Sequence, residues 1–213
     1  MNQVSDLLQL LDYLGIAVFA ATGALAASRK QLDIVAFVFF GAVTAIGGGT
    51  LRDMLLDVPV FWVRHPTYLA IALGAAILVY FTAHLLESRY RVLLWADAVG
   101  LAAYAVVGAA KTFNAGASAA DALALGVLTA TFGGVIRDVL AGEPSVILRG
   151  DLYITCAFAG AASFVVLAAA GAPFWAAATA GFLVAFAVRA GALIWGWTLP
   201  VYRARPGRDS TKL

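Results

Sequence analysis

The sequence predicts an all-α membrane protein of seven transmembrane helices, arranged as two inverted three-helix repeats plus a seventh helix. Composition supports the membrane assignment, because 63% of the 213 residues are hydrophobic, only 12% are charged and the mean hydropathy is +0.92. Soluble domains average about 45–50% apolar and about 25% charged residues. The chain is therefore too apolar to be covered by a wetted surface, and an internal repeat divides its helices into two halves.

The spans are recognised as runs of about 20 mostly apolar residues, separated by linkers that carry charges, glycine and proline. The predicted helices are Leu11–Ser28, Asp33–Leu56, Thr67–Leu86, Val92–Thr112, Ser118–Ala141, Leu152–Ala170 and Pro173–Thr198. They leave no room for a soluble domain, so residues 1–213 are expected to form one membrane domain. No lysine or arginine precedes the first apolar run, which argues against a signal peptide.

An odd number of spans predicts that the two termini lie on opposite sides of the membrane. Basic residues set the orientation, because cytoplasmic loops carry an excess of lysine and arginine. The richer side holds Arg29, Lys30, Arg89, Arg91, Arg149 and the basic tail, residues 199–213. We therefore expect the N-terminus outside and the tail in the cytoplasm, where its basic residues would contact anionic membrane lipid.

The repeat appears when the chain is shifted without gaps by 85 residues, the separation of Asp12 and Asp97. The same shift aligns Arg52-Asp53 with Arg137-Asp138, Pro59 with Pro144, Arg64 with Arg149 and Tyr68 with Tyr153. The repeats are expected over residues 11–86 and 92–170, followed by the seventh helix over 173–198. Three helices are an odd number, so the second copy enters the membrane in the opposite direction, as in many transporters.

Each repeat carries a glycine motif in its second helix, "TAIGGGTLRD" in the first copy and "TATFGGVIRD" in the second. Glycine costs about 1 kcal/mol relative to alanine inside a helix, so these runs predict breaks or kinks. Exposed backbone inside a membrane is tolerated where it lines a wet cavity. The candidate pore or gate residues are Gly47, Gly48, Gly49, Gly133 and Gly134.

Two threonines precede the glycines by one turn. The hydroxyls of Thr44 and Thr129 would either line the pathway or bond back to the carbonyl one turn earlier. Carbonyl oxygens freed near Gly48 and Gly133 would be transient ligands for potassium, replacing the hydration shell of the ion.

The charged pairs that follow the glycines are expensive inside a membrane and usually face a cavity or a partner. Arg52, Asp53, Arg137 and Asp138 are therefore candidate pathway residues, with one pair on each side of the glycines. The alternative is structural ion pairing, for example between Arg52 and Asp138. Asp12 and Asp97 begin the predicted first and fourth helices, where they act either as N-caps or as a charged vestibule.

The doubled GG-x-x-RD motif, on two sets of three helices plus a seventh, resembles the trimeric intracellular cation channels, and in particular their prokaryotic members. The resemblance covers residues 11 to about 198. It implies a homotrimer in the inner membrane, with one pore per subunit selective for monovalent cations, especially potassium, and gated or occluded at the glycines. Animal members carry a lysine-containing lipid-binding segment in the fifth helix, whereas this chain has no basic residue between Lys111 and Arg137.

Two function classes remain open from the sequence. A passive potassium channel follows from the resemblance, whereas a secondary transporter for a small zwitterion such as glycine fits the Arg-Asp chemistry almost as well, and related bacterial sequences carry that description. An enzyme is not expected, because there is no nucleophile-base arrangement, and no cofactor is implied. A net charge of +2 gives no reason to expect nucleic acid as a partner.

Overall fold

The computed structural model describes residues 3–86, 88–145, 147 and 152–200, with side chains described from residue 8 onward. The predicted basic tail lies outside the described residues, apart from 199 and 200. The helices are α1 (Gln3–Arg29), α2 (Ile34–Leu55), α3 (Phe61–Arg64), α4 (Thr67–Thr82), α5 (Arg89–Asn114), α6 (Ala119–Leu140), α7 (Ile154–Ala169) and α8 (Phe174–Trp195), with a 3₁₀ turn, η1 (Ala83–Leu85), after α4.

Membrane-length helices account for six of the seven predicted spans among the described residues, and α7 is a shorter apolar helix of 16 residues. The prediction of an all-α fold of seven membrane helices in two inverted repeats is confirmed. The short α3 was not predicted. Helix α1 begins eight residues before the predicted Leu11, which places Asp12 inside the helix.

Local sequence signals explain several helix ends. Asp33 caps α2 by accepting a hydrogen bond from the Ala36 N–H at 2.8 Å, and Ser118 forms a capping box with Asp121 at the start of α6. Gly116, Gly142 and Gly171 follow the ends of α5, α6 and α7 with positive φ, where a left-handed residue ends a helix without a Cβ penalty.

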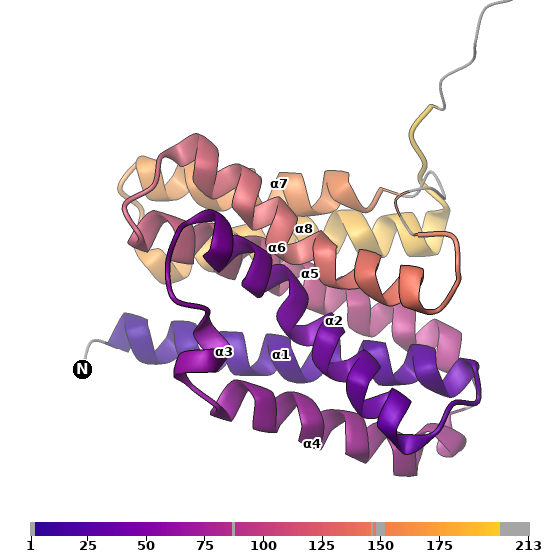
Figure 1. The fold of residues 1–213 in the computed structure, drawn as a ribbon. Helices are drawn as coiled ribbons and strands as arrows, with labels where there is room; N and C mark the ends of the chain where they lie inside the picture. Colours follow the sequence, from indigo (N-terminus) through magenta and orange to yellow (C-terminus); the bar gives the residue numbers. More distant parts are fainter. Residues whose placement is uncertain (1–2, 87, 146, 148–151, 201–213) are drawn as a thin grey trace, which may run out of the picture.

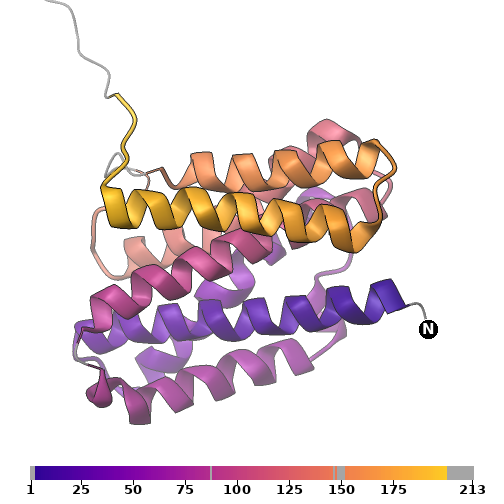
Figure 2. The ribbon, with the colours of Figure 1, turned by 180° about the vertical axis from the view of Figure 1, so that it is seen from behind.

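The helices pack into a bundle whose centre is α5, which contacts α1, α6, α7 and α8. Helices α2 and α6, the second helices of the two repeats, cross each other next to it. Figures 1 and 2 show α1 and α4 on one side of the bundle and α7 and α8 on the other, with the first and last described residues at opposite ends. The interior is built largely from alanine and glycine, which let membrane helices approach closely.

Large apolar side chains lie on the outside of the bundle. Val35, Phe39, Phe81 and Val166 are each more than half exposed. In a soluble protein such a surface would be a liability, whereas hydrocarbon is its natural solvent. The distribution of apolar groups therefore agrees with a multi-pass membrane protein.

Candidate functional site: two buried charge clusters on either side of a glycine crossing

The glycine motifs meet where α2 crosses α6. A Cβ atom added at Gly48 would collide with the backbone carbonyl oxygen of Thr129, and one added at Gly133 would collide with the carbonyl oxygen of Thr44. The contacts are reciprocal, as the inverted repeat requires. At this crossing only glycine allows one backbone to lie directly against the other.

The sequence predicted a break or a kink in these helices; the break is wrong, and the kink stays a prediction. Both α2 and α6 run as helices through their glycines, and positive φ values occur at other glycines, namely Gly116, Gly142, Gly171 and Gly196. The reason is physical: close packing against the partner helix compensates for the weak helix propensity of glycine. The glycines thus hold the two repeats in contact rather than opening the backbone.

The two threonines of the motif differ. The Thr129 hydroxyl donates to the Leu125 carbonyl, one turn earlier, at 2.6 Å, as one of the two readings expected. The Thr44 hydroxyl oxygen is buried with no hydrogen-bond partner. The crossing therefore contains one satisfied and one unsatisfied hydroxyl next to the reciprocal carbonyls.

The first-repeat cluster consists of Asp12, Arg52, Asp53 and Lys111, at the end of the bundle where α1 begins. The Arg52 guanidinium donates to Asp53 Oδ1 from Nε at 2.9 Å and from Nη2 at 2.6 Å. The other Asp53 oxygen accepts the backbone N–H of Phe61 at 2.9 Å, so the unpredicted α3 has a clear role. Asp12 is paired instead with the Lys111 ammonium.

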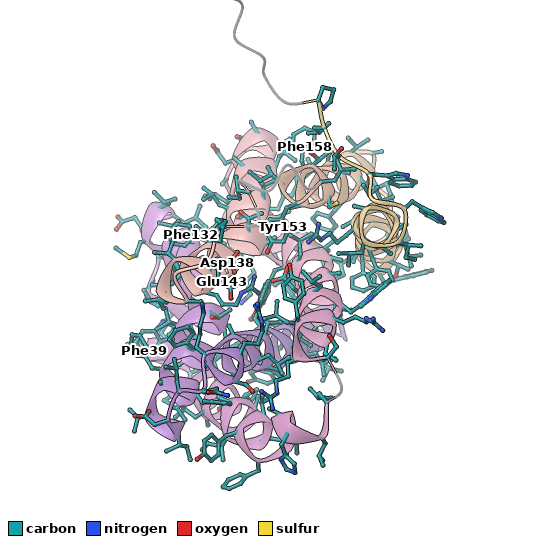
Figure 3. All side chains as sticks on the ribbon, turned by 90° about the vertical axis from the view of Figure 1, so that its right-hand side faces the viewer. Phe39, Phe132, Asp138, Glu143, Tyr153 and Phe158 are labelled. Carbon is teal, nitrogen blue, oxygen red and sulfur yellow. The ribbon has the colours of Figure 1, made fainter. Side chains whose placement is uncertain are left out.

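The second-repeat cluster consists of Asp97, Arg137 and Asp138, at the opposite end. Arg137 Nη1 lies 2.6 Å from Asp97 Oδ1, and its Nη2 lies 2.9 Å from Asp138 Oδ1. One guanidinium thus binds two carboxylates, and all three side chains are buried. Seen end-on, Asp138 and Tyr153 lie near the middle of the bundle, whereas Phe39 and Phe158 lie at its edge (Figure 3).

The clusters correct two sequence interpretations. Asp12 and Asp97 are not N-caps, since both lie well inside helices and are only 1% exposed. Arg52 does not pair with Asp138, because its carboxylate partner is its neighbour Asp53. Gly48 lies against Thr129 and Gly133 against Thr44, so α2 and α6 run in opposite directions. Continuing that register places Leu125 at the same level as Arg52. Asp138 lies 13 residues further along α6 (138 − 125), roughly 20 Å along the helix axis.

Sequence reasoning missed three residues that complete these clusters. The Lys111 ammonium at the end of α5 turns to the Asp12 carboxylate. Tyr104 donates to the Asp12 carbonyl oxygen at 3.3 Å, and Arg189 of α8, fully buried, lies 5.2 Å from the centre of the Tyr153 ring. Arg189 stands 85 residues after Tyr104, so the repeat offset, extended once more, would have pointed to it.

Cavities of very different size adjoin the two clusters. A cavity of about 320 Å³ borders the first-repeat cluster and is lined partly by Arg52, Asp53, Arg64 and Lys111. The cavity beside the second-repeat cluster measures about 10 Å³, hardly room for one water molecule. Among the described residues the first end therefore has room for water or an ion, whereas the second end has almost none.

A bridge of surface charges lies beside the second-repeat cluster. Glu143 accepts a hydrogen bond from Arg29 at 3.0 Å, and the Lys30 ammonium lies 3.5 Å away. Burial by itself would raise the pKa of Glu143, but the hydrogen bond from Arg29 and the charges of Arg29 and Lys30 outweigh it, so the pKa is lowered. Figure 3 shows Glu143 beside Asp138 at this end.

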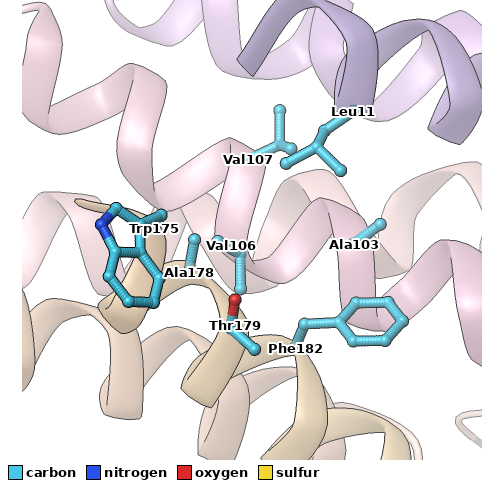
Figure 4. Close-up of a pocket in the computed structure, with 8 residues that line it drawn as sticks. All are labelled: Leu11, Ala103, Val106, Val107, Trp175, Ala178, Thr179 and Phe182. Carbon is cyan, nitrogen blue, oxygen red and sulfur yellow. The ribbon is translucent and has the colours of Figure 1, made fainter. Parts of the chain in front are cut away.

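A further cavity, of about 270 Å³, lies between α1, α5 and α8 (Figure 4). Its lining residues are almost all apolar: Leu11, Ala103, Val106, Val107, Trp175, Ala178, Thr179 and Phe182. A cavity of this character suits hydrocarbon rather than an ion. Among the described residues no group of three or more histidine, cysteine or acidic side chains is placed to hold a metal ion.

Comparison with known proteins agrees with this geometry. A family model described as a glycine transporter matches residues 9–84 and again 94–169, two segments whose starts are 85 residues apart. UPF0126 inner membrane protein YadS of Escherichia coli K12 is 40% identical over 198 residues, 90% of this chain and 94% of its own. A UPF0126 membrane protein of Vibrio cholerae is 37% identical over 204 residues, 93% of this chain and 84% of its own.

Several solved structures that are similar to this chain are cation channels. The TRIC trimeric intracellular cation channel orthologue of Rhodobacter sphaeroides is 54% identical, with a TM-score of 0.87 over 90% of this chain and 99% of its own. The chain belongs to the trimeric intracellular cation channel family. A prokaryotic TRIC channel solved in 0.5 M KCl is 28% identical, with a TM-score of 0.84 over 92% of this chain and 100% of its own.

Membership in the TRIC family confirms the resemblance drawn from the doubled motif. The TRIC relatives are channels rather than enzymes, which confirms the expectation that this chain is not an enzyme. The TRIC fold also confirms that this is a multi-pass membrane protein, and a close relative is an inner membrane protein.

Proposed function

We propose that this protein is a monovalent cation channel, selective for potassium, that assembles as a homotrimer with one pore in each subunit. The observation that carries the proposal is the arrangement of a charge cluster at each end of the bundle with the α2–α6 crossing between them. The 54% identity to a TRIC channel over nearly the whole chain supports the same reading. Potassium and other monovalent cations are its partners, together with membrane lipid and two further copies of the chain.

The proposed pathway is closed in this conformation. Gly48 and Gly133 press α2 and α6 together between the clusters, and the second-repeat end is sealed. Opening therefore requires the helices to separate at the crossing, which would free the carbonyls of Thr44 and Thr129 to replace the hydration shell of an ion. In this reading Gly47, Gly49 and Gly134 let neighbouring side chains pack against the two helices beside the crossing, and the glycine pairs act as a gate.

The proposed orientation places the first-repeat cluster outside and the second-repeat cluster on the cytoplasmic side of the inner membrane. Arg29, Lys30, Arg89 and Arg91 lie at the second-repeat end, and this excess of positive charge supports the proposal that it faces the cytoplasm. The N-terminus is then outside, and the open cavity faces the periplasm.

Single-channel recording of the purified protein in planar bilayers tests the channel. Discrete currents should reverse at the potassium equilibrium potential in a KCl gradient. The second candidate function, secondary transport of a zwitterion, is favoured by the glycine-transporter description of the family model and by clusters that offer both guanidinium and carboxylate. Saturable glycine uptake into vesicles without unitary currents would overturn the channel proposal in favour of that candidate.

A further inference from the structure

Lys111 is held in a site that has the chemistry of a cation receptor. Its ammonium is paired with the carboxylate of Asp12, which is buried, and lies 5.2 Å from the ring centre of Phe61 and 5.6 Å from that of Tyr68. The two rings pack edge to face at 4.8 Å, so they form one wall. A carboxylate with two aromatic faces attracts a monovalent cation or an ammonium group.

The nearby charged residues are paired with one another, and the ion-pair partner of Asp12 is Lys111. Asp53 is satisfied by Arg52 and by the Phe61 N–H. In the second repeat the matching carboxylate, Asp97, is bound by the arginine of its own repeat. Asp12 is instead neutralised by a lysine from α5, the helix that follows the repeat.

Lysine is suited to leaving such a site, because its charge is compact and sits on a flexible four-carbon stem. The cavity of about 320 Å³ lies next to it and is lined by Lys111, with Arg64 and His65 further along its wall. The Lys111 side chain is 23% exposed, so it reaches both the buried carboxylate and the cavity. An ammonium that swings into the cavity exposes Asp12, Phe61 and Tyr68 to an incoming ion.

We propose that Asp12, Phe61 and Tyr68 form a monovalent cation site at the open end of the pathway, and that the Lys111 ammonium occupies this site as a tethered competitor that a permeating cation displaces. The inference rests on the proposed channel function, which it extends by naming the first ion site and the group that guards it. A tethered competitor lowers the apparent affinity by the fraction of time for which the site is vacant.

The first test is the potassium dependence of flux into vesicles containing the full-length protein, comparing wild type with Lys111→Met. Methionine keeps a flexible stem of similar length without the charge. If Lys111 leaves the site about a tenth of the time, the potassium concentration for half-maximal flux should fall about tenfold. Asp12→Asn added to Lys111→Met should abolish this gain. Arg64→Met, which removes a charge from the same cavity wall without touching Asp12, is the matched control.

A second test does not depend on conduction. Because a ligand that binds the folded state raises its stability, KCl should raise the unfolding temperature of Lys111→Met above its value in N-methyl-D-glucamine chloride. The rise should be smaller in wild type and absent in the Asp12→Asn/Lys111→Met double variant.

The outcomes separate the two proposals. A wild-type protein that carries no potassium current, while KCl still stabilises Lys111→Met, would leave the cation site standing and overturn the channel. Potassium currents in wild type that are unchanged in Lys111→Met, or changed equally by Arg64→Met, would overturn the tethered competitor. A Lys111→Met protein that does not fold would be replaced in both assays by Lys111→Gln, to which the same criteria apply.

Discussion

The two charge clusters of the molecule are related by the internal repeat, yet their ion pairs connect different residues. In the second-repeat cluster one buried guanidinium, that of Arg137, binds both Asp97 and Asp138. In the first-repeat cluster Arg52 binds Asp53 alone among the described carboxylates, and Asp12 turns to Lys111. A planar guanidinium that bridges two carboxylates is rigid, whereas a lysine is mobile. The rigid cluster adjoins a cavity of about 10 Å³ and the mobile one adjoins about 320 Å³.

An inverted repeat can therefore supply symmetric parts and still build an asymmetric pathway. The Arg-Asp pairs and the glycine crossing are present in both halves. The groups that complete each cluster come from the helix after the repeat, Lys111 from α5 and Arg189 from α8, and these two residues are not related by the offset. The asymmetry between the two ends therefore originates in residues that the repeat does not duplicate.

Removing each arginine in turn should cause the greatest loss of stability. Arg137→Met removes the cation that the buried Asp97 and Asp138 share, and removing one partner of a buried ion pair costs about 3–5 kcal/mol. Arg52→Met strands only Asp53, which keeps the Phe61 N–H, while Asp12 keeps Lys111. Thermal unfolding of the two variants in detergent should show a clearly larger loss for Arg137→Met. Equal losses of unfolding temperature would mean that the difference in ion pairing between the two clusters does not affect stability.

An intermediate effect should be the same in both halves, because the crossing is symmetric. Gly48→Ala and Gly133→Ala each drive a Cβ into a backbone carbonyl, which cannot move aside as a side chain would. Overpacking of this kind costs about 1–3 kcal/mol. Each variant should lower the unfolding temperature and change potassium flux. Gly74→Ala in α4, where the added Cβ meets no atom within 4 Å, is the control and should be neutral or slightly stabilising.

How far the sequence predicts this site depends on which signal each residue carries. Composition and the repeat are enough for the fold and for Arg52, Asp53, Arg137 and Asp138, because buried charges in apolar spans stand out. The role of Asp12 was open, since apolar counting starts α1 at Leu11 and misses its polar first turns. A hydropathy pattern carries no information on such turns, so a residue inside a helix is mistaken for its cap.

For the glycines the sequence predicts the correct position but the wrong local structure. Their number and place point correctly to where the repeats meet, but propensity alone predicts a break where the structure has continuous helices. What decides between a break and a close contact is the partner backbone, here the carbonyls of Thr129 and Thr44. The contact with that backbone is a tertiary interaction, which a local sequence pattern does not reveal.

The smallest expected effect concerns the charge bridge over the closed end. The pKa of Glu143 is lowered in the folded state, chiefly because the bond from Arg29 and the nearby positive charges outweigh burial. The bridge therefore stabilises the fold at pH values above the unfolded pKa, and this contribution is lost as the pH falls through the lower, folded value. Partly exposed pairs contribute about 0–1 kcal/mol.

Glu143→Gln should accordingly cost little at neutral pH and should flatten the acid limb of the stability curve, measured as unfolding temperature between about pH 3 and pH 6. Asp33→Asn removes an exposed carboxylate that caps α2 at the same end of the bundle, and serves as the matched control. If the bridge seals the second-repeat end, Glu143→Gln should also raise potassium flux, whereas Asp33→Asn should not. A flatter acid limb without a change in flux would assign Glu143 to stability alone and would place the closure in Arg137 and its two carboxylates.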